Sequence, residues 1–537
     1  MDHVQTARSP RFAKALAYVA DHAFLFFCLA LVISAACKLL SLHSRELWLD
    51  ETYSAFIAHL PFAQLSSHLT GEYNPPFYYL LLWLWTRLVG DAQGQLRLFG
   101  IIINICAMAG MYLLARRILG ERFGALAAAL FAFSPMLFVY SLEVRSYMLF
   151  ILAFIGLLTA HWALAIQQKE EKWLIVTYAV LAALLFYINY IGVFVLIGLC
   201  LHWILAVGFD QRRIVRLVSA GLLTILLIAP GISPLLYRNS LKHELNQARE
   251  ASHDNSSALS YGAADQKSSA VRGLAKSSAA MAGFYPASSP LLLLLCALPL
   301  SLALAGAIYF GLAKGDELCR LFVVMALALG VGAIVLHLSA TRYLLPLVPL
   351  LVLAVARAIQ QASTNSRWRV ASLSVATLIL CLYAAGFFRQ TFIHHGRPWQ
   401  NLVSAVQHNS QSGDTVVFDA LYAQVPFDYF ARQVHFSPHE TGFPLSIYDW
   451  WSKQKNQAWG GPVILHADLD DFPARLAASD AKTLLIVRYE TYYYDPQDAL
   501  LARMRQLGKV EEISLPPDPD ATSEDESLRL FRVTARQ

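Results

Sequence analysis

An acidic pair directly follows the first long apolar segment of the chain. Residues 47–53 (LWLDETY) place Asp50 and Glu51 beside apolar and aromatic side chains. Burial near hydrocarbon raises the pKa of a carboxylate, and a nearby cation lowers it again. A carboxylate kept ionised there can take a proton from a hydroxyl group, so Asp50 is a candidate general base. The alternative is structural, with Asp50 as the N-cap of a helix over 51–60 and Glu51 in its first turn.

Two arginines stand next to later apolar segments. Residues 141–147 (SLEVRSY) form a very short turn in which Glu143 and Arg145 can pair, or Arg145 can face a phosphate. Residues 339–343 (SATRY) open another segment, where Arg342 either binds an anionic ligand or extends towards lipid headgroups.

A pair of prolines in residues 72–76 (EYNPP) fixes an extended entry into an aromatic run over 77–89. Asn74 can orient a ligand there or cap the turn. Asp50, Arg145 and Arg342 thus come from regions far apart in the sequence. If the fold brings them to one face, the pattern favours a site for an anionic, lipid-attached substrate.

The elements that must position these residues are apolar. The chain has 537 residues, of which 57% are hydrophobic and only 15% are charged, whereas soluble domains carry about 25% charged residues. Runs of about 20 apolar residues can span a bilayer, and only helices satisfy their own backbone there. We expect eleven spans, at 24–40, 96–118, 122–140, 147–166, 173–188, 190–208, 214–236, 290–313, 320–337, 343–359 and 370–388.

The basic residues give these spans an orientation. With the N-terminus inside, the inside segments hold most of the Lys and Arg, whereas the short outside turns hold only Arg145 and Arg342. The aromatic run 77–89 is too short to cross comfortably, and a crossing there would invert every later segment. We therefore expect 77–89 to lie at the membrane interface.

Three longer stretches then face outside. The loop 41–95 carries the acidic pair, and the polar loop 237–289, rich in Ser, Ala and Gly, is expected to be mobile. Residues 389–537 predict a small α/β domain. Its strands are expected at 415–418, 483–487 and 528–533, and a helical pattern covers 496–508.

These motifs together resemble the GT-C glycosyltransferases. The resemblance rests on residues 49–53 (LDETY) after the first span, residues 74–79 (NPPFYY) before the aromatic run and residues 141–147 (SLEVRSY) after the third span. More narrowly, it is to the bacterial protein-mannosyltransferase-like branch, the dolichyl-phosphate-mannose transferase-like or family 39 group. It covers 45–165 well, and continues more loosely through 342–346 and 399–429.

The resemblance implies a polytopic all-α GT-C module over 1–388, a polyprenyl-phosphate-sugar donor and transfer with inversion at the anomeric carbon. The family's catalytic base maps to Asp50, and Glu51 would orient the acceptor or position Arg145. Arg145 and Arg342 would contact the leaving phosphate, which needs positive charge more than a general acid. Glu143 would hold the arginine geometry, and the remaining substrate-binding candidates are Tyr53, Asn74, Tyr147 and Tyr343.

The chain departs from the family at Asn74, where a histidine usually precedes the two prolines. Asparagine binds metal or phosphate poorly, and no tight His/Asp/Glu cluster replaces it, so we predict no metal and no other cofactor. The expected partners are the donor, membrane lipid and a glycan, lipid or protein acceptor, with no nucleic acid. We expect a multi-pass protein of the inner (plasma) membrane, with its site and C-terminal domain periplasmic. The alternatives are a transporter of lipid-linked sugars or small solutes and a non-catalytic subunit of envelope polysaccharide assembly.

Overall fold

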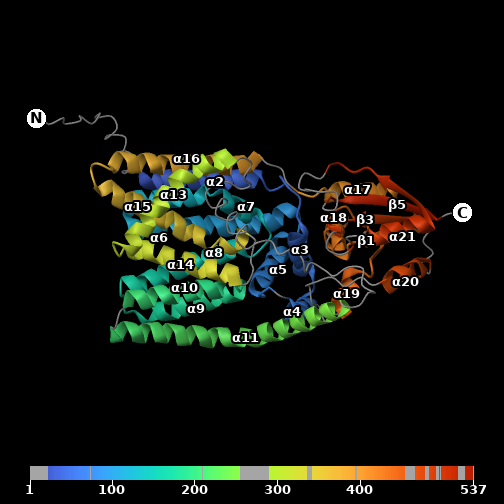
Figure 1. The fold of residues 1–537 in the computed structure, drawn as a ribbon, viewed down its shortest axis with the longest axis horizontal. Coiled ribbons are helices and arrows are strands. Elements are labelled where there is room, and N and C mark those ends of the chain that lie inside the picture. The colour runs from blue at the N-terminus through green and yellow to red at the C-terminus, as the bar shows by residue number, and fades with distance from the viewer. Residues whose placement is uncertain are drawn as a thin grey trace, which may run out of the picture.

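The computed structural model describes residues 22–72, 74–207, 210–253, 290–335, 341–392, 396–453, 466–477, 483–491, 495, 498–517 and 527–535. A long helical bundle lies at one end of the molecule and a small sheet with its helices at the other (Figure 1). Three helices lie between them: α3 (Leu49–His59), α4 (Phe62–Gly71) and α5 (Phe77–Val89). The bundle, the sheet and the three intermediate helices together place the acidic pair at one end of the bundle.

The bundle consists of apolar helices. They are α2 (Ala23–Leu40), α6 (Gln93–Ala132), α7 (Pro135–Leu142), α8 (Tyr147–His161), α9 (Lys172–Ile188), α10 (Gly192–Val207), α11 (Gln211–His253), α13 (Pro290–Leu312), α14 (Glu317–Val335), α15 (Leu347–Thr364) and α16 (Arg369–Phe392). Within the described residues, seven helices are long and apolar enough to cross a membrane, and four apolar helices are shorter. The prediction of a polytopic helical protein is confirmed, and the number of eleven spans stays a prediction.

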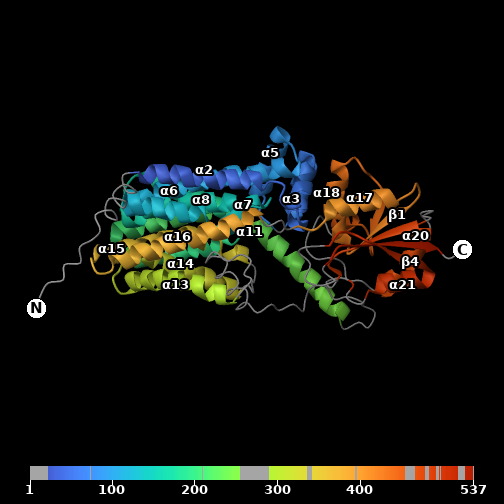
Figure 2. The same cartoon turned by 90° about the horizontal axis from the view of Figure 1, so that it is seen from above.

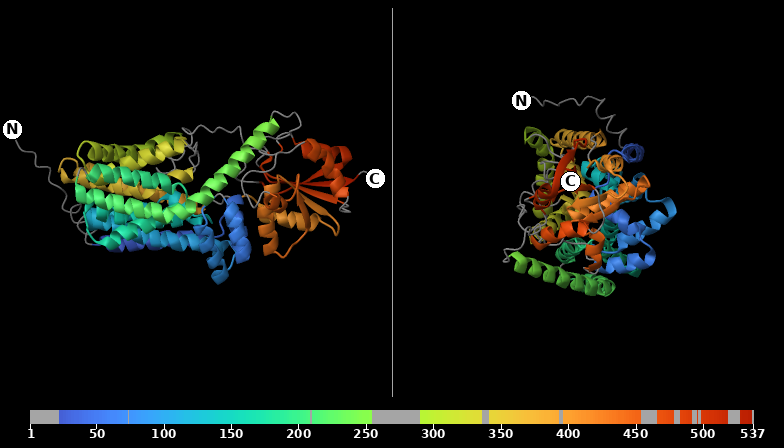
Figure 3. Two further views of the ribbon diagram at one scale, coloured as in Figure 1. Left: turned by 90° about the horizontal axis from the view of Figure 1, so that it is seen from below. Right: turned by 90° about the vertical axis from the view of Figure 1, so that its right-hand side faces the viewer.

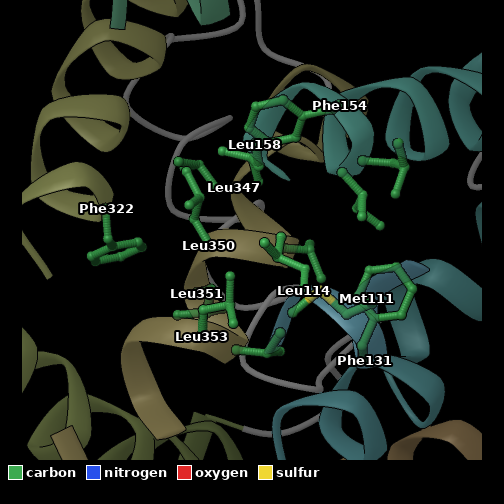
Figure 4. Close-up of a cluster of buried hydrophobic side chains, with 14 of the residues drawn as sticks. Met111, Leu114, Phe131, Phe154, Leu158, Phe322, Leu347, Leu350, Leu351 and Leu353 are labelled. Carbon is green, nitrogen blue, oxygen red and sulfur yellow. The ribbon is translucent and has the colours of Figure 1, made fainter. Parts of the chain in front are cut away.

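The bundle core is built from aliphatic and aromatic side chains of α6, α8, α14 and α15. Figure 4 shows part of it, where Met111, Phe154 and Leu350 are all less than 1% exposed. In the C-terminal sheet domain, burial of such side chains is favourable because it removes apolar surface from water. Inside a bilayer the driving force is instead close packing and satisfied backbone hydrogen bonds.

Helix α6 reverses direction at Gly120, whose φ of 77° lies in the left-handed region that glycine tolerates. A Cβ atom on Gly124 would lie 2.6 Å from the Cα atom of Arg116. Residues eight apart in a straight helix are separated by about 12 Å. The two halves of α6 therefore form a tight hairpin, in agreement with the two segments predicted on either side of 118–122.

The predicted outer loop 237–289 is wrong in its first part. Helix α11 continues through His253, although Pro230 and Pro234 interrupt its hydrogen bonding. It extends beyond the end of the bundle towards the sheet (Figure 2, Figure 3). The remainder of that stretch, 254–289, lies outside the described residues, so its expected mobility stays a prediction.

The C-terminal sheet has five strands in the order β2-β1-β3-β5-β4. They are β1 (Thr415–Asp419), β2 (His439–Gly442), β3 (Thr483–Arg488), β4 (Gly508–Ile513) and β5 (Arg529–Ala535). Strand β1 pairs in parallel with β2 and β3, whereas β3–β5 and β4–β5 are antiparallel. The three predicted strands are confirmed, and β2 and β4 were missed.

Helices cover both faces of the sheet. Phe418 and Leu485 pack with α17 (Trp399–Asn409) and α18 (Gln424–Gln433). Val417 and Ile486, which point the opposite way because side chains alternate along a strand, pack with α20 (His466–Ala477) and α21 (Ala499–Leu507). The helix predicted over 496–508 corresponds to α21. A further short helix, α19 (Ile447–Lys453), lies near α3.

The sheet domain and the intermediate helices share one hydrophobic core. Ala55 of α3 and Leu82 of α5 belong to the same buried cluster as Phe427 of α18. Tyr429 Oη donates a hydrogen bond to the Asp91 carbonyl oxygen at 3.0 Å. The domain is thereby fixed directly against the helix that carries Asp50.

Candidate active site

Asp50 lies in the first turn of α3 and faces two arginines. Its Oδ2 atom is 3.5 Å from Arg342 Nη1 and 3.8 Å from Arg145 Nη2. Arg145 belongs to the turn between α7 and α8, and Arg342 to a short 3-10 helix, Thr341–Leu344, that precedes α15. The structure thus brings the three predicted residues together from segments that are far apart in the sequence.

The contacts within this cluster leave it able to bind a ligand. The side chains of Asp50, Arg145 and Arg342 remain 30%, 12% and 27% exposed. Charge-assisted hydrogen bonds between N–H and carboxylate groups are normally about 2.7–2.9 Å long, so separations of 3.5 and 3.8 Å are charge contacts. The carboxylate therefore has lone pairs left for a proton, and the guanidinium groups have N–H donors left for an anion.

Each arginine is held by the protein on its other side. Arg145 Nη1 donates to the Asp50 carbonyl oxygen at 3.3 Å and to Ser54 Oγ at 3.5 Å. The Arg342 guanidinium lies over the rings of Trp48 and Tyr343, at 6.0 and 5.6 Å from their centroids. Cation–π contact holds Arg342 without consuming its N–H donors. Tyr343, a predicted substrate contact, thus supports Arg342.

Both arginines stay cationic in this setting. Burial lowers the pKa of Arg145, but the Asp50 carboxylate and two neighbouring tyrosines outweigh it, so that pKa ends well above its ordinary value. Burial acts in the same direction on Arg342, and the tyrosines together with Asp50 again leave its pKa raised. The cluster therefore presents two permanent positive charges beside one carboxylate.

Asp50 is not the N-cap of its helix, which corrects the structural alternative. The cap is Trp48, and α3 begins at Leu49. Glu51 Oε2 accepts a hydrogen bond from the Trp48 backbone N–H at 3.2 Å. Since Glu51 satisfies the start of the helix, the Asp50 side chain is left to face the arginines.

Glu51 also joins α3 to the turn that carries Arg145. Its carboxylate is 1% exposed, accepts the Val144 backbone N–H at 2.9 Å and lies 3.7 Å from Arg97 Nη2. A side chain that is so completely buried cannot touch an acceptor. Of the two roles predicted for Glu51, the geometry favours positioning Arg145.

Glu143 lies among the arginines of the site. Burial raises the pKa of Glu143 to about 7, against the opposing charges of Arg45, Arg342 and Arg145. Arg145 contacts Asp50, so the simple Glu143–Arg145 ion pair is not the arrangement seen among the described residues. Tyr147, the next predicted contact, packs edge-on against Tyr140 at 5.1 Å and supports the Arg145 side chain.

Tyr53 and Asn74 have their polar groups engaged within the protein. The Tyr53 hydroxyl donates to Glu72 Oε2 and lies 2.9 Å from His68 Nε2. The Asn74 backbone N–H and Nδ2 both donate to Glu72 Oε1, at 3.0 and 2.8 Å. Glu72 is fully buried and closes the loop before α5. This favours the turn-capping alternative for Asn74.

Sequence reasoning missed Arg97 and Glu72, the two buried charges that hold the site loops. Arg97 Nη1 donates to the carbonyl oxygens of Leu42 and Arg45, at 2.8 and 2.5 Å. It anchors the segment between α2 and α3. The available signal was an arginine at the start of an apolar run, a place where a charge is costly without a partner. Among the described residues, no group of three or more His, Cys, Asp or Glu is arranged to hold a metal ion.

Glu46 predicts a pH dependence of stability. It accepts the Gln400 backbone N–H at 3.1 Å, and burial raises its pKa from an ordinary value of 4.5 to about 7. A carboxyl with a raised pKa binds its proton more tightly when folded, so the contribution of Glu46 to stability is fully present below pH 4.5 and is lost as pH rises to about 7. We expect the apparent melting temperature to be lower at pH 8 than at pH 5.

Glu46→Gln should reduce this fall, measured by tryptophan fluorescence at a series of pH values. Some fall should remain, because the raised pKa of Glu143 acts with the same sign. Glu512→Gln is the matched control. Pairing with Arg529 lowers the pKa of Glu512, so this carboxylate stays ionised between pH 5 and 8 and its replacement should leave the fall unchanged. An identical pH profile for wild type and Glu46→Gln would contradict the assignment.

Comparisons with known proteins agree with the fold. A family model described as dolichyl-phosphate-mannose-protein mannosyltransferase matches residues 73–237. ArnT from Cupriavidus metallidurans in the apo state is 13% identical with a TM-score of 0.61, covering 97% of this chain and 98% of that chain. A comparison with curated proteins finds no match.

Two further structures have the same architecture. ArnT from Cupriavidus metallidurans bound to undecaprenyl phosphate is 14% identical with a TM-score of 0.55, covering 94% of this chain and 97% of that one. The Archaeoglobus fulgidus oligosaccharyltransferase in complex with Zn and sulfate is 12% identical with a TM-score of 0.53. That match covers 90% of this chain and 72% of the other. At these identities the likeness establishes the fold.

Proposed function

We propose that this chain, which has the GT-C fold, is a multi-pass membrane glycosyltransferase that transfers a sugar from a polyprenyl-phosphate-linked donor to an acceptor outside the cytoplasm. The observation that carries this proposal is the Asp50 carboxylate within 3.8 Å of two arginines at one end of the bundle. The ArnT structure with bound undecaprenyl phosphate supports a lipid phosphate as the ligand of this fold.

In this proposal the arginines hold the phosphate of the donor. When the sugar leaves, the polyprenyl phosphate carries the electron pair of the broken bond and needs no proton. Two fixed guanidinium groups stabilise that charge better than water does, because their positive charges and N–H donors are already in place. Arg145 lies in the short turn before α8 and Arg342 in the 3-10 helix before α15, so two helices of the bundle set the separation between their charges.

Asp50 then acts on the acceptor. The acceptor oxygen attacks the anomeric carbon from the side opposite the phosphate, the bond to the phosphate breaks, and the configuration inverts. The hydroxyl proton passes to the Asp50 carboxylate. Binding of the phosphate gives the arginines a second anionic partner, which frees the carboxylate for this proton transfer.

The positions of the charges also support an orientation of the chain in the membrane. The fold supports a boundary between its two domains. The proposed outer face is the end where basic residues are scarce in the sequence, so the site faces away from the cytoplasm. We divide the chain into a membrane module over 1–388 and an extracytoplasmic domain over 389–537. The shared core of α3, α5 and α18 makes that domain a brace for the site.

Arg342→Ala should lower kcat/KM for the donor by about 10²–10³-fold, because it removes one preorganised charge from the leaving phosphate. Arg342→Lys should recover part of the loss, since it restores charge without the planar fork. Initial rates over a range of donor concentrations measure both effects. Arg117→Ala, at an exposed arginine hydrogen-bonded to Gln167 elsewhere in the bundle, is the matched control. Equal rates for Arg342→Ala and the control would contradict the phosphate contact.

Release of polyprenyl phosphate tests the proposed function. Purified protein in liposomes is given a polyprenyl-phosphate sugar that carries label in the sugar, together with an acceptor glycan, and both products are followed by thin-layer chromatography and mass spectrometry. A glycosyltransferase separates the label from the lipid. A transporter moves the intact labelled lipid across the bilayer, and a non-catalytic subunit does neither, so each of those results rejects the proposal.

A further inference from the structure

A cavity lies between α3 and the sheet domain, apart from the Asp50–arginine cluster. Its volume is about 540 Å³, within the range of about 300–1,000 Å³ that ligand pockets occupy. Thr52, Phe56 and His59 form its α3 wall. Successive helix residues turn by about 100°, so this stripe lies on the side of α3 opposite Asp50. The cavity is therefore separate from the Asp50–arginine cluster and only one helix away from it.

One part of the cavity wall is aromatic. The rings of Phe56 and Tyr448 both line it and lie 5.4 Å apart. Trp451 supports them, with its ring 5.3 Å from Phe56 and 5.6 Å from Tyr448. Aromatic rings packed at an angle to one another present a rigid apolar surface. Such a surface suits the C–H face of a sugar ring.

Another part of the wall carries two carboxyl groups. The Tyr448 hydroxyl donates to Asp428, and Gln424 Nε2 donates to Glu440 Oε1 at 2.9 Å. Burial and the mutual repulsion of these groups raise the pKa of Asp428 to about 9, and burial raises the pKa of Glu440 as well. At neutral pH Asp428 and Glu440 therefore share a proton in a hydrogen bond between them, and their remaining carboxyl lone pairs can accept from a hydroxyl group.

The rim of the cavity is also polar. His59 Nδ1 and Arg432 Nη2 both contact Asp91 Oδ2, at 3.1 and 3.0 Å. An acyl chain would displace water from these polar groups without offering any hydrogen bond in return, which is costly. A ligand with one apolar face and several hydroxyl groups at its edge can pack on the aromatic part of the wall and hydrogen-bond to the polar part.

We propose that this cavity binds a sugar ring of the acceptor, which makes the acceptor a glycan that spans α3 between this cavity and Asp50. The inference rests on the proposed function for its link to transfer, whereas binding in the cavity can be measured without any transfer. It narrows the acceptor to a molecule of at least two sugar units, because the reacting hydroxyl and the bound ring lie on opposite sides of one helix.

Saturation-transfer NMR on the full-length protein in lipid nanodiscs tests this inference. The probes are maltose, cellobiose and chitobiose, with an acetylated Ala-Ser-Thr-Ala amide as the peptide probe. We expect at least one disaccharide to bind, and Glu440→Gln to weaken that binding by about tenfold, which equals about 1.4 kcal/mol. Phe56→Leu should weaken it as well. Gel filtration shows whether each variant is folded. If Phe56→Leu does not fold, the isosteric variant Glu440→Gln still tests the inference.

Two control variants separate this inference from the proposed function. Glu511→Gln, at an exposed carboxylate on β4, should bind the disaccharide as wild type does. Asp50→Asn should also bind it normally, even though it no longer transfers sugar. The inference is overturned if no disaccharide binds, if neither cavity variant weakens binding, or if only the peptide binds. Loss of the proposed function would show as absent transfer with disaccharide binding intact.

Discussion

Asp50→Asn is expected to lower kcat for sugar transfer by about 10²–10⁴-fold, the range that a positioned general base contributes. Asparagine keeps the shape of the side chain and removes only its basicity. Because Asp50 is 30% exposed and is not the helix cap, its replacement should leave the fold intact. The loss therefore reports on proton transfer.

The same variant should bind the donor at least as tightly as wild type does. In the structure the Asp50 carboxylate contacts Arg145 and Arg342, so under the proposed function it competes with the donor phosphate for them, and asparagine removes this competitor. A residue with a merely structural role would not raise donor affinity. Single-turnover kinetics with labelled donor separate the binding step from the chemical step.

Asp210→Asn is the matched control for this experiment, because the exposed Asp210 carboxylate directly precedes α11 and pairs with Arg213, far from Asp50 in the sequence. It should leave both kcat and donor affinity unchanged. If Asp50→Asn transfers sugar at the wild-type rate, Asp50 is not the base. Glu143, the other carboxyl among the arginines of the site, would then be the residue to replace next.

The fold could be predicted because each level of the sequence carried its own signal. Apolar runs of span length indicated the bundle, and Thr415–Asp419 and Arg529–Ala535 have the β-branched and apolar composition of buried strands. The strand His439–Gly442 (HETG) was missed because it is short and polar, and it pairs with the sheet through its backbone. Helix α11 was cut short in the prediction because polar composition is a poor guide to where a long helix ends.

The candidate site was predicted from the scarcity of basic residues in the short outside turns. Arg145 and Arg342 stood out because arginines are rare in short outside turns, and the structure places both beside Asp50. The supporting contacts could not be predicted in the same way. Glu72 contacts both Tyr53 and Asn74 because the loop before α5 lies against α3. A single sequence has no pattern that indicates this loop conformation.

The second large effect is expected on stability, from Arg97→Met. Arg97 and Glu51 are 0% and 1% exposed, and methionine would leave the Glu51 carboxylate buried without its cation. Breaking a buried ion pair by removing one partner costs about 3–5 kcal/mol. The carbonyl oxygens of Leu42 and Arg45 would also lose their donor. We expect a large drop in the apparent melting temperature, measured by tryptophan fluorescence and by recovery from gel filtration after heating.

Arg116→Met is the matched control, because Arg116 lies in the same helix α6 and pairs with Glu121 in an exposed ion pair. Such pairs are worth about 0–1 kcal/mol, so its melting temperature should be close to that of wild type. The double variant Arg97→Met/Glu51→Gln should recover part of the loss, because it no longer buries an unpaired charge. Additive losses in the double variant would show that Arg97 acts through the loop carbonyls alone. Recovery would show that the buried Arg97–Glu51 pair itself stabilises the junction of α6 with the start of α3, the helix that carries Asp50.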